Sequence, residues 1–207
     1  MTTRFLTRSA ALACLVFSLP AFAADMAPEA MVQKVAGETL SAIKADKAMQ
    51  TGDINRIIAL VDRTVMPNVN FTRMTGTAVG PAWRTATAAQ KTQLEKEFKT
   101  LLVRTYAGAF KMANDKELKM LPMRGAATGT DVLVQSQLTG GAEPIPMDYR
   151  LEKTPGQGLG WKAYNIAISG VWMIQSYKQQ FAQEISSKGI DGLIASLAAQ
   201  NKANAAK

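Results

Sequence analysis

The chain has 207 residues, with 24 basic and 16 acidic residues, one cysteine and no histidine. Without histidine, serine–histidine and cysteine–histidine catalysis are excluded, and zinc loses its usual ligand. Catalysis by carboxylates, lysine or tyrosine remains open, but the acidic residues are scattered and no pair of them stands out in an apolar segment. The sequence therefore offers few parts for an enzyme, and we expect no enzyme activity.

The N-terminal segment has the pattern of a cleavable signal peptide. Arg4 and Arg8 precede the apolar run AALACLVFSL, Pro20 ends it, and AFA follows at residues 21–23. A run of this length is typical of a signal peptide and too short for a membrane anchor, the alternative interpretation. We predict a signal peptide over 1–23, cleavage after Ala23, periplasmic export and one domain over 24–207. Cys14 lies in the leader, so the mature chain has no disulfide.

The mature chain keeps 22 basic against 16 acidic residues, a net charge of +6. The excess of positive charge favours either a solvated surface or attraction to lipid headgroups or acidic proteins. Nucleic acid is not expected as a partner, because no basic and aromatic recognition motif is present.

The first half of the mature chain has helical periodicity. We predict a helix over 28–49, with a modest apolar face, and a second helix after Asp53, which is placed to cap it. Short helices follow over 68–83. Thr87 and Gln90 have the spacing of a capping box, which predicts the start of a long helix over 88–112.

The period then changes to two, which predicts strands near 117–124, 131–139, 145–152 and 161–169. The short turns between them require antiparallel pairing. Alternation in the last strand puts Lys162, Tyr164, Ile166 and Ile168 on one face. After Gly170, expected to end the sheet, two helices follow with Gly189 between them. The fold class is α+β, and we expect the apolar face of the sheet to pack on the long helix.

Two long stretches carry a resemblance to a known family. The first, VMPNVNFTRMTGTAVGPAWRTATAAQKTQLEKEFKTLLVRTYAGAF, covers residues 65–110, and the second is PIPMDYRLEK…GWKAYNIAISGVWMIQSYKQQF. Together with GIDGLIASL near the C-terminus, they resemble the MlaC family of periplasmic phospholipid carriers, also described as toluene-tolerance proteins. Trp172 departs from the family pattern, which has a small residue there, and a bulky ring at that position would narrow or reshape the mouth of a cavity.

The resemblance implies helices and a four-stranded antiparallel sheet around a deep apolar pocket, similar in outline to nuclear transport factor 2. It implies a monomer that binds phospholipid as its ligand and needs no metal or cofactor. The implied role is carriage between an MlaA-like outer-membrane lipoprotein–porin complex and an MlaFEDB-like inner-membrane ABC transporter complex, which maintains outer-membrane lipid asymmetry.

The resemblance and the apolar periodicity together suggest a set of lipid-binding residues. The predicted pocket wall consists of Phe71, Met74, Val79, Phe98, Leu102, Tyr106, Val134, Ile145, Met147, Tyr149, Ile166, Ile168, Val171 and Trp172. The predicted headgroup or rim residues are Arg73, Arg84 and Lys178. For each apolar residue the alternative is an ordinary core contact, because most such stripes pack solidly.

Two other functions remain as alternatives. A periplasmic enzyme, hydrolase-like on a cone-shaped α+β fold, would need a titratable group in the pocket, for which Asp148 and Glu143 are the nearest candidates. A chaperone or adaptor would use the same apolar groove for peptide. The many methionines suit a surface that accepts varied apolar shapes, although methionine also fills gaps in ordinary cores.

Overall fold

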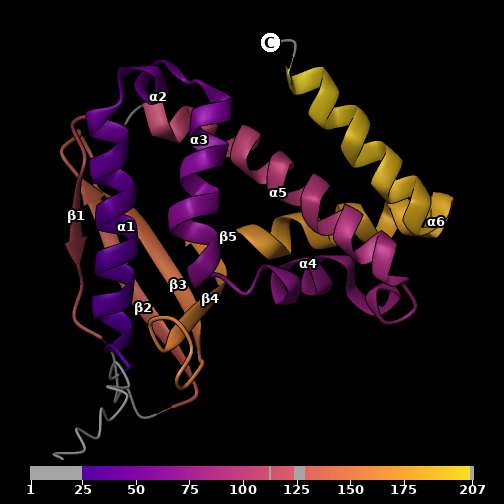
Figure 1. Cartoon of the computed structure of the whole chain (residues 1–207), viewed down its shortest axis with the longest axis horizontal. Coiled ribbons are helices and arrows are strands. Elements are labelled where there is room, and N and C mark those ends of the chain that lie inside the picture. The colour runs from indigo at the N-terminus through magenta and orange to yellow at the C-terminus, as the bar shows by residue number, and fades with distance from the viewer. Residues whose placement is uncertain (1–24, 112, 124–128, 206–207) are drawn as a thin grey trace, which may run out of the picture.

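The computed structural model describes residues 25–111, 113–123 and 129–205. The predicted signal peptide and its cleavage site lie outside these residues. The described chain has two halves (Figure 1). One half consists of the sheet and the three N-terminal helices beside it, and the other half is helical. One long helix, residues 88–111, extends across both halves.

The elements follow the predicted order. The helices are α1 (Pro28–Ala45), α2 (Lys47–Thr51), α3 (Ile54–Leu60), α4 (Phe71–Val79), α5 (Ala88–Lys111) and α6 (Met173–Ala205), with a π-helical turn η1 (Val61–Val65) and 3₁₀ turns η2 (Met66–Asn68) and η3 (Gly80–Arg84). The strands are β1 (Glu117–Met120), β2 (Asp131–Thr139), β3 (Ile145–Lys153), β4 (Trp161–Ile168) and β5 (Val171–Trp172).

Local signals determine several helix boundaries. The Asp53 carboxylate accepts hydrogen bonds from the N–H groups of Asn55 and Arg56, which confirms its predicted role as the cap of α3. Thr87 and Gln90 form the predicted capping box at the start of α5. The predicted helix over 28–49 divides at Asp46. The Asp46 side chain accepts hydrogen bonds from the N–H groups of Ala48 and Met49 and so caps a separate helix, α2. Gly189, at φ 71°, interrupts α6 as predicted.

The sheet is an antiparallel meander in the order β1-β2-β3-β4-β5. The α+β class is confirmed, but the sheet has five strands rather than four. Ser169 and Gly170 both have positive φ, 51° and 80°, and form a two-residue turn between the paired residues Ile168 and Val171. Such turns match the twist of a hairpin, so the chain turns back and adds β5 instead of leaving the sheet.

A bulge in β4 changes which of its side chains share a face. Arg150 pairs with Asn165 but Leu151 pairs with Ala163, so Tyr164 is the extra residue. The strict alternation predicted for this strand is therefore wrong. Ala163 joins Ile166 and Ile168 on the face toward α1, whereas Tyr164 joins the opposite face, because a bulge shifts the register by one residue.

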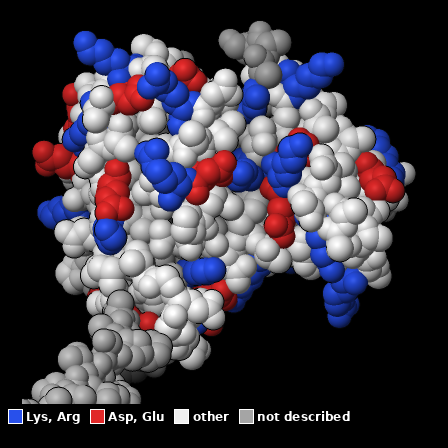
Figure 2. All heavy atoms as spheres, viewed as in Figure 1, with Lys and Arg blue, Asp and Glu red and all other residues white. Residues whose placement is uncertain are grey.

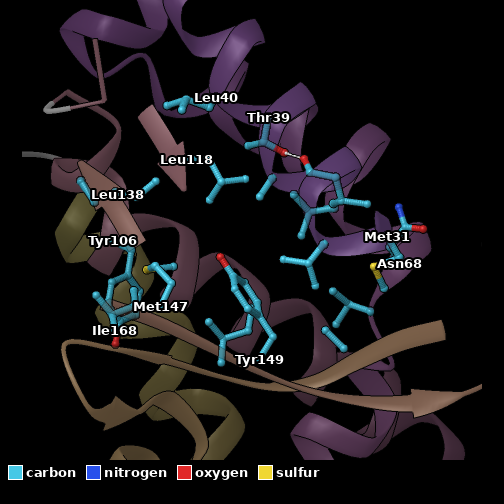
Figure 3. Close-up of a pocket in the computed structure, with 18 of the residues that line it drawn as sticks. Met31, Thr39, Leu40, Asn68, Tyr106, Leu118, Leu138, Met147, Tyr149 and Ile168 are labelled. Carbon is cyan, nitrogen blue, oxygen red and sulfur yellow. Dashed lines mark hydrogen bonds between the residues drawn. The ribbon is translucent and has the colours of Figure 1, made fainter. Parts of the chain in front are cut away.

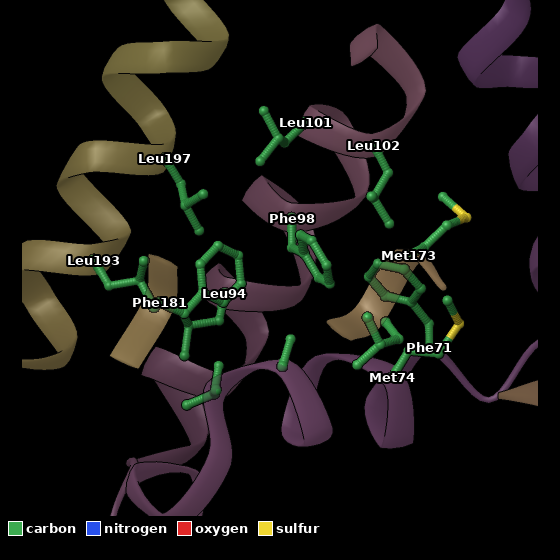
Figure 4. Packing of buried hydrophobic residues seen from close by; sticks show 13 residues of the cluster. Phe71, Met74, Leu94, Phe98, Leu101, Leu102, Met173, Phe181, Leu193 and Leu197 are labelled. Atoms are coloured by element: carbon green, nitrogen blue, oxygen red, sulfur yellow. The ribbon is translucent and has the colours of Figure 1, made fainter. Parts of the chain in front are cut away.

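Of the clusters of buried hydrophobic residues in the described chain, the one in the helical half has the most members. Phe98 of α5 is fully buried, and its ring centroid lies 5.1 Å from that of Phe181 and 5.8 Å from that of Phe71. The cluster holds α4, α5 and α6 together (Figure 4). Its buried members are Phe71, Met74, Ala78, Val79, Leu94, Phe98, Leu101, Leu102, Met173, Ile174, Phe181, Leu193 and Leu197.

The apolar face of the sheet packs on α1, not on the long helix as predicted. Met31 and Val32 of α1 cluster with Val134, Leu151 and other residues of the sheet. The apolar face of α5 is instead covered by α4 and α6. Only the C-terminal end of α5 approaches the sheet.

Charged residues of both signs are interspersed over the face shown in Figure 2. On that face no broad single-sign patch gathers the excess of Lys and Arg. Its basic residues therefore match the solvated-surface interpretation of the net charge.

Candidate functional site

An apolar cavity of about 270 Å³ lies between α1 and the sheet, beside the C-terminal end of α5. In Figure 3 the side chains of Thr39 and Leu40 face those of Tyr149 and Met147 across this space. The lining residues are Met31, Val32, Val35, Ala36, Thr39, Leu40, Ile43, Val65, Asn68, Val69, Tyr106, Ala109, Ala113, Leu118, Leu138, Met147, Tyr149, Leu151, Ala163, Ile166 and Ile168.

The cavity has a closed end and an open end. Met31, Val32 and Leu151 are buried at the closed end, near the N-terminus of α1. At the other end Ala109 is exposed, and Leu118 and Leu138 are half-buried. We take the open end to be where the end of α5 approaches β1 and β2, because Ala109, the most exposed of the lining residues, lies there, although Ala113 beside it is buried.

Among the described residues, the wall of the cavity carries no charged side chain. Two of its polar side chains are bonded within the protein: Thr39 Oγ1 donates to the carbonyl of Val35 at 2.7 Å, and Asn68 Nδ2 donates to that of Thr64 at 3.0 Å. The hydroxyl of Tyr149 accepts a hydrogen bond from Ser136 Oγ at 3.2 Å. Burial raises the pKa of Tyr149 and also that of Tyr106, so both phenols stay neutral at physiological pH.

The cavity between α1 and the sheet persists because α1 is attached to the rest of the protein near its two ends and not at its middle. At the N-terminal end, Trp161 Nε1 donates to the carbonyl of Met26 at 3.0 Å, and Met26 N–H donates to the carbonyl of Leu159 at 3.1 Å. At the C-terminal end, Ile43 is buried in a separate cluster with Ile57, Leu60 and Val103. Between these attachments the helix spans the face of the sheet without filling it.

Five of the predicted wall residues meet around the cavity: Tyr106, Met147, Tyr149, Ile166 and Ile168. Those on the sheet come together because Met147 pairs with Ile168 and Tyr149 pairs with Ile166 on one face of neighbouring strands. Val134 lies on the same face, fully buried beside its register partner Tyr149, but does not line the cavity.

Another five predicted wall residues lie in the close-packed core of the helical half instead. They are Phe71, Met74, Val79, Phe98 and Leu102. Their stripe is helical as predicted, but α6 supplies Phe181, Leu193 and Leu197 to cover it, so no space remains.

The last three predicted wall residues lie outside the lining. Ile145 and Val171 are register partners of Leu138 and Ile168 on the cavity face of the sheet, and Val171 is 55% exposed at the sheet edge. Trp172 faces the other side of the sheet, because it pairs with Ala167. The guanidinium carbon of Arg150 lies 4.6 Å from the centre of its ring, so the Trp172 side chain does not narrow the cavity in this structure.

Sequence reasoning missed the contribution of α1, which supplies seven of the lining residues. Met31, Val35, Leu40 and Ile43 form a recognisable stripe, so the signal for an apolar helix face was present. The pattern contains no information about which surface that face opposes.

None of the predicted rim cations lines the cavity. Arg73 lies on the opposite face of the sheet, where it forms ion pairs with Glu152 and with Asp131 and stacks on Tyr164, with 3.4 Å from its guanidinium carbon to the ring centre. Burial alone would lower the pKa of Arg73, but its hydrogen bond to Glu152 and the neighbouring carboxylates raise it overall. Arg84 and Lys178 are exposed in the helical half.

Because the charge of Arg73 is already matched, Arg73→Ala is expected to affect stability rather than ligand binding. We expect a loss of about 1–2 kcal/mol in the free energy of unfolding, since the site is part-exposed and the ion pairs are screened. Urea denaturation measures this. Arg84→Ala, at an exposed position, is the control and should change stability by less than about 0.5 kcal/mol. Altered ligand occupancy in Arg73→Ala, with unchanged stability, would contradict this assignment.

The acids considered for an enzyme are also remote from the cavity wall. Asp148 lies on the opposite face of the sheet, where its Oδ1 accepts a hydrogen bond from Gln135 Nε2 at 2.9 Å. Glu143 is exposed in the turn before β3. Within the described ranges, no group of acids, cysteines or histidines is placed to hold a metal ion.

An α+β fold around an uncharged apolar cavity defines a class of proteins that hold an apolar ligand away from water. The sequence model of the MlaC protein family matches residues 33–199, and this chain belongs to the MlaC family.

Among the described residues, no helix has the length and apolar character needed to cross a bilayer.

Named relatives agree with this assignment. The chain is 23% identical over 188 residues to the intermembrane phospholipid transport system binding protein MlaC of Haemophilus influenzae, covering 87% of each chain. It is 25% identical over 170 residues to the toluene tolerance protein ttg2D of Pseudomonas putida, covering 81% of this chain and 77% of that protein. The phospholipid-binding protein from Ralstonia solanacearum, solved in complex with a phospholipid, superposes with a TM-score of 0.82 at 39% identity, over 87% of this chain and 99% of that one.

Proposed function

We propose that the protein is a phospholipid carrier that encloses an acyl chain in the cavity between α1 and the sheet. The observation that carries the proposal is an open cavity of about 270 Å³ with an uncharged wall. Such a wall offers hydrocarbon an environment close to that of a bilayer and offers a polar ligand no matching groups. The phospholipid bound to the Ralstonia solanacearum relative supports the same ligand class.

The size of the cavity favours one acyl chain. A cavity of about 150 Å³ in another protein admits benzene, so about 270 Å³ is on the order of a single partly enclosed chain. We propose that a second chain enters only if α1 moves away from the sheet. That movement would stretch the attachments of α1 at Met26 and Ile43.

The energetics of such a cavity suit carriage. A chain of about sixteen carbons gains roughly 13 kcal/mol on leaving water, at about 0.8 kcal/mol per methylene. In a bilayer the same chain is already out of water, so exchange between membrane and cavity is close to neutral. The carrier therefore holds lipid firmly in water and releases it where a membrane complex offers an apolar path.

We further propose that the exported, mature chain acts as a monomer in the periplasm, between the outer-membrane lipoprotein–porin complex and the inner-membrane ABC transporter complex. This traffic would maintain the lipid asymmetry of the outer membrane. The family assignment and the phospholipid transport named for the Haemophilus influenzae relative support this part of the proposal. The cavity is proposed to carry its ligand without covalent change, because the described residues of its wall include no acid, lysine or arginine.

Native mass spectrometry of the protein after gentle extraction tests the proposal. We expect adducts with the masses of phospholipids, close to one per chain. Peptide adducts would favour the chaperone alternative, and an empty protein that hydrolyses ester substrates would favour an enzyme. Either result would overturn lipid carriage.

A further inference from the structure

Lys116 is a buried lysine close to the open end of the cavity. It is only 8% exposed, which is unusual for lysine. In the chain it lies between Ala113 and Leu118, and both of these residues line the cavity.

The turn between β2 and β3 leaves room for the ammonium group of Lys116. A Cβ atom on Gly141 would lie 2.1 Å from Lys116 Nζ, so the ammonium occupies space that glycine leaves free. A Cβ on Gly140, which has φ 91°, would lie 1.8 Å from the carbonyl oxygen of Asp115. The two glycines thus allow this turn to pack closely on the segment that carries Lys116.

No acidic residue neutralises this lysine in the described part of the chain. The ion pairs found there do not include Lys116, although Asp115, Glu117 and Glu143 are near it in the chain or across the turn. Nor is Lys116 Nζ among the fully buried, unbonded atoms, so the nitrogen remains reachable from solvent. The stem of Lys116 is therefore buried while its ammonium group reaches solvent without an ion-pair partner, so the ammonium is available to bind an anion.

Lys116 directly precedes β1, and continuing the alternation of that strand by one residue puts Lys116 on the same side of the sheet as Leu118. Glu117 and Lys119 of β1 are exposed, whereas Leu118 between them lines the cavity. Lys116 precedes Leu118 by two residues and is buried, as expected for the same face. An anion at Lys116 would therefore lie just outside the open end of the apolar space.

We propose that the Lys116 ammonium binds the phosphate group of the phospholipid whose acyl chain occupies the cavity. This inference rests on the proposed lipid-carrier function and adds a polar contact to it. A charge-assisted hydrogen bond to phosphate is among the stronger single contacts in proteins. Lys116 then gives preference for a phosphate-bearing lipid over a neutral one with the same chains, and the rest of the headgroup stays in water.

Competitive loading from mixed vesicles tests this inference. The purified protein is loaded from vesicles that contain phosphatidylglycerol and diacylglycerol with identical chains, and the bound lipids are quantified by mass spectrometry. The wild-type chain should prefer the phospholipid, and Lys116→Met should reduce that preference by about tenfold or more. Lys116→Arg, which keeps the charge, should retain most of it.

Lys119→Met is the matched control, because Lys119 lies on β1 but on the exposed face. It should leave the preference unchanged. An unchanged preference in Lys116→Met, or an equal loss in Lys119→Met, would overturn the assignment. If the wild-type chain loads both lipids without preference, the Lys116 inference fails while lipid carriage stands. If it loads neither lipid, carriage itself fails.

Inorganic phosphate distinguishes a lipid headgroup from a free anion. Nuclear magnetic resonance titration of the delipidated protein with inorganic phosphate should give no saturable shift of the Gly141 amide signal, because no acyl chain holds the anion in place. Saturable binding that persists in the lipid-loaded protein would show a free-anion site and overturn the headgroup assignment.

Discussion

Phe98→Ala is expected to lower the free energy of unfolding by about 3–5 kcal/mol, because it empties the centre of the helical core. The ring is fully buried and contacts the rings of Phe71, Tyr177 and Phe181, so the cavity left behind cannot collapse easily. For a chain of this size the loss corresponds to a fall of roughly 10 °C in Tm. Thermal and urea unfolding measure it directly.

Ile168→Ala is the comparison for this prediction. Ile168 faces the existing cavity, so its side chain has fewer protein contacts to lose, and we expect less than half the effect of Phe98→Ala. In the fraction of Phe98→Ala that stays folded, lipid occupancy should match that of the unmodified protein. Reduced lipid occupancy without reduced stability would instead indicate that Phe98 contacts the ligand, as the sequence predicted.

Met147→Trp is expected to reduce lipid occupancy strongly while the fold persists. Met147 is half-buried on β3 and points into the cavity, so a larger ring there takes space from the ligand (Figure 3). If the ring displaces about three methylenes, binding weakens by roughly 2.4 kcal/mol, or about 50-fold. Lipid extraction and native mass spectrometry give the occupancy, and circular dichroism checks the fold.

Leu133→Trp provides the matched control on the same sheet. Leu133 is 44% exposed and lies on the face opposite the cavity, in register with Arg150. The added ring should leave lipid occupancy unchanged. Equal occupancy in Met147→Trp and the unmodified chain would show that the ligand does not occupy this cavity.

Leu102→Trp separates the two environments in another way. Sequence periodicity alone makes Leu102 and Met147 equivalent candidates for the pocket wall. In the structure Leu102 is buried in the helical core, where extra volume forces neighbouring side chains apart at a cost of typically 1–3 kcal/mol. This substitution would therefore test packing, whereas Met147→Trp tests ligand space.

The amino-acid sequence by itself determined the helices, the principal strands and several of their boundaries, because these depend on local chemistry. The capping box at Thr87 and the cap at Asp53 need only a few neighbouring residues. Alternation in β3 likewise placed Met147 and Tyr149 on one face. The motifs shared with the family also identified the family itself.

Only the tertiary structure decided where the empty space lies, since a cavity is the volume left when surfaces from distant segments fail to meet. An apolar stripe is equally consistent with a filled core and with a ligand wall. The stripe of α5 at Phe98 is covered by α6, whereas the stripe of α1 at Val35 faces a gap, because the attachments at Met26 and Ile43 hold that helix away from the sheet. The burial of Lys116 likewise depends on a turn that approaches it from another strand pair.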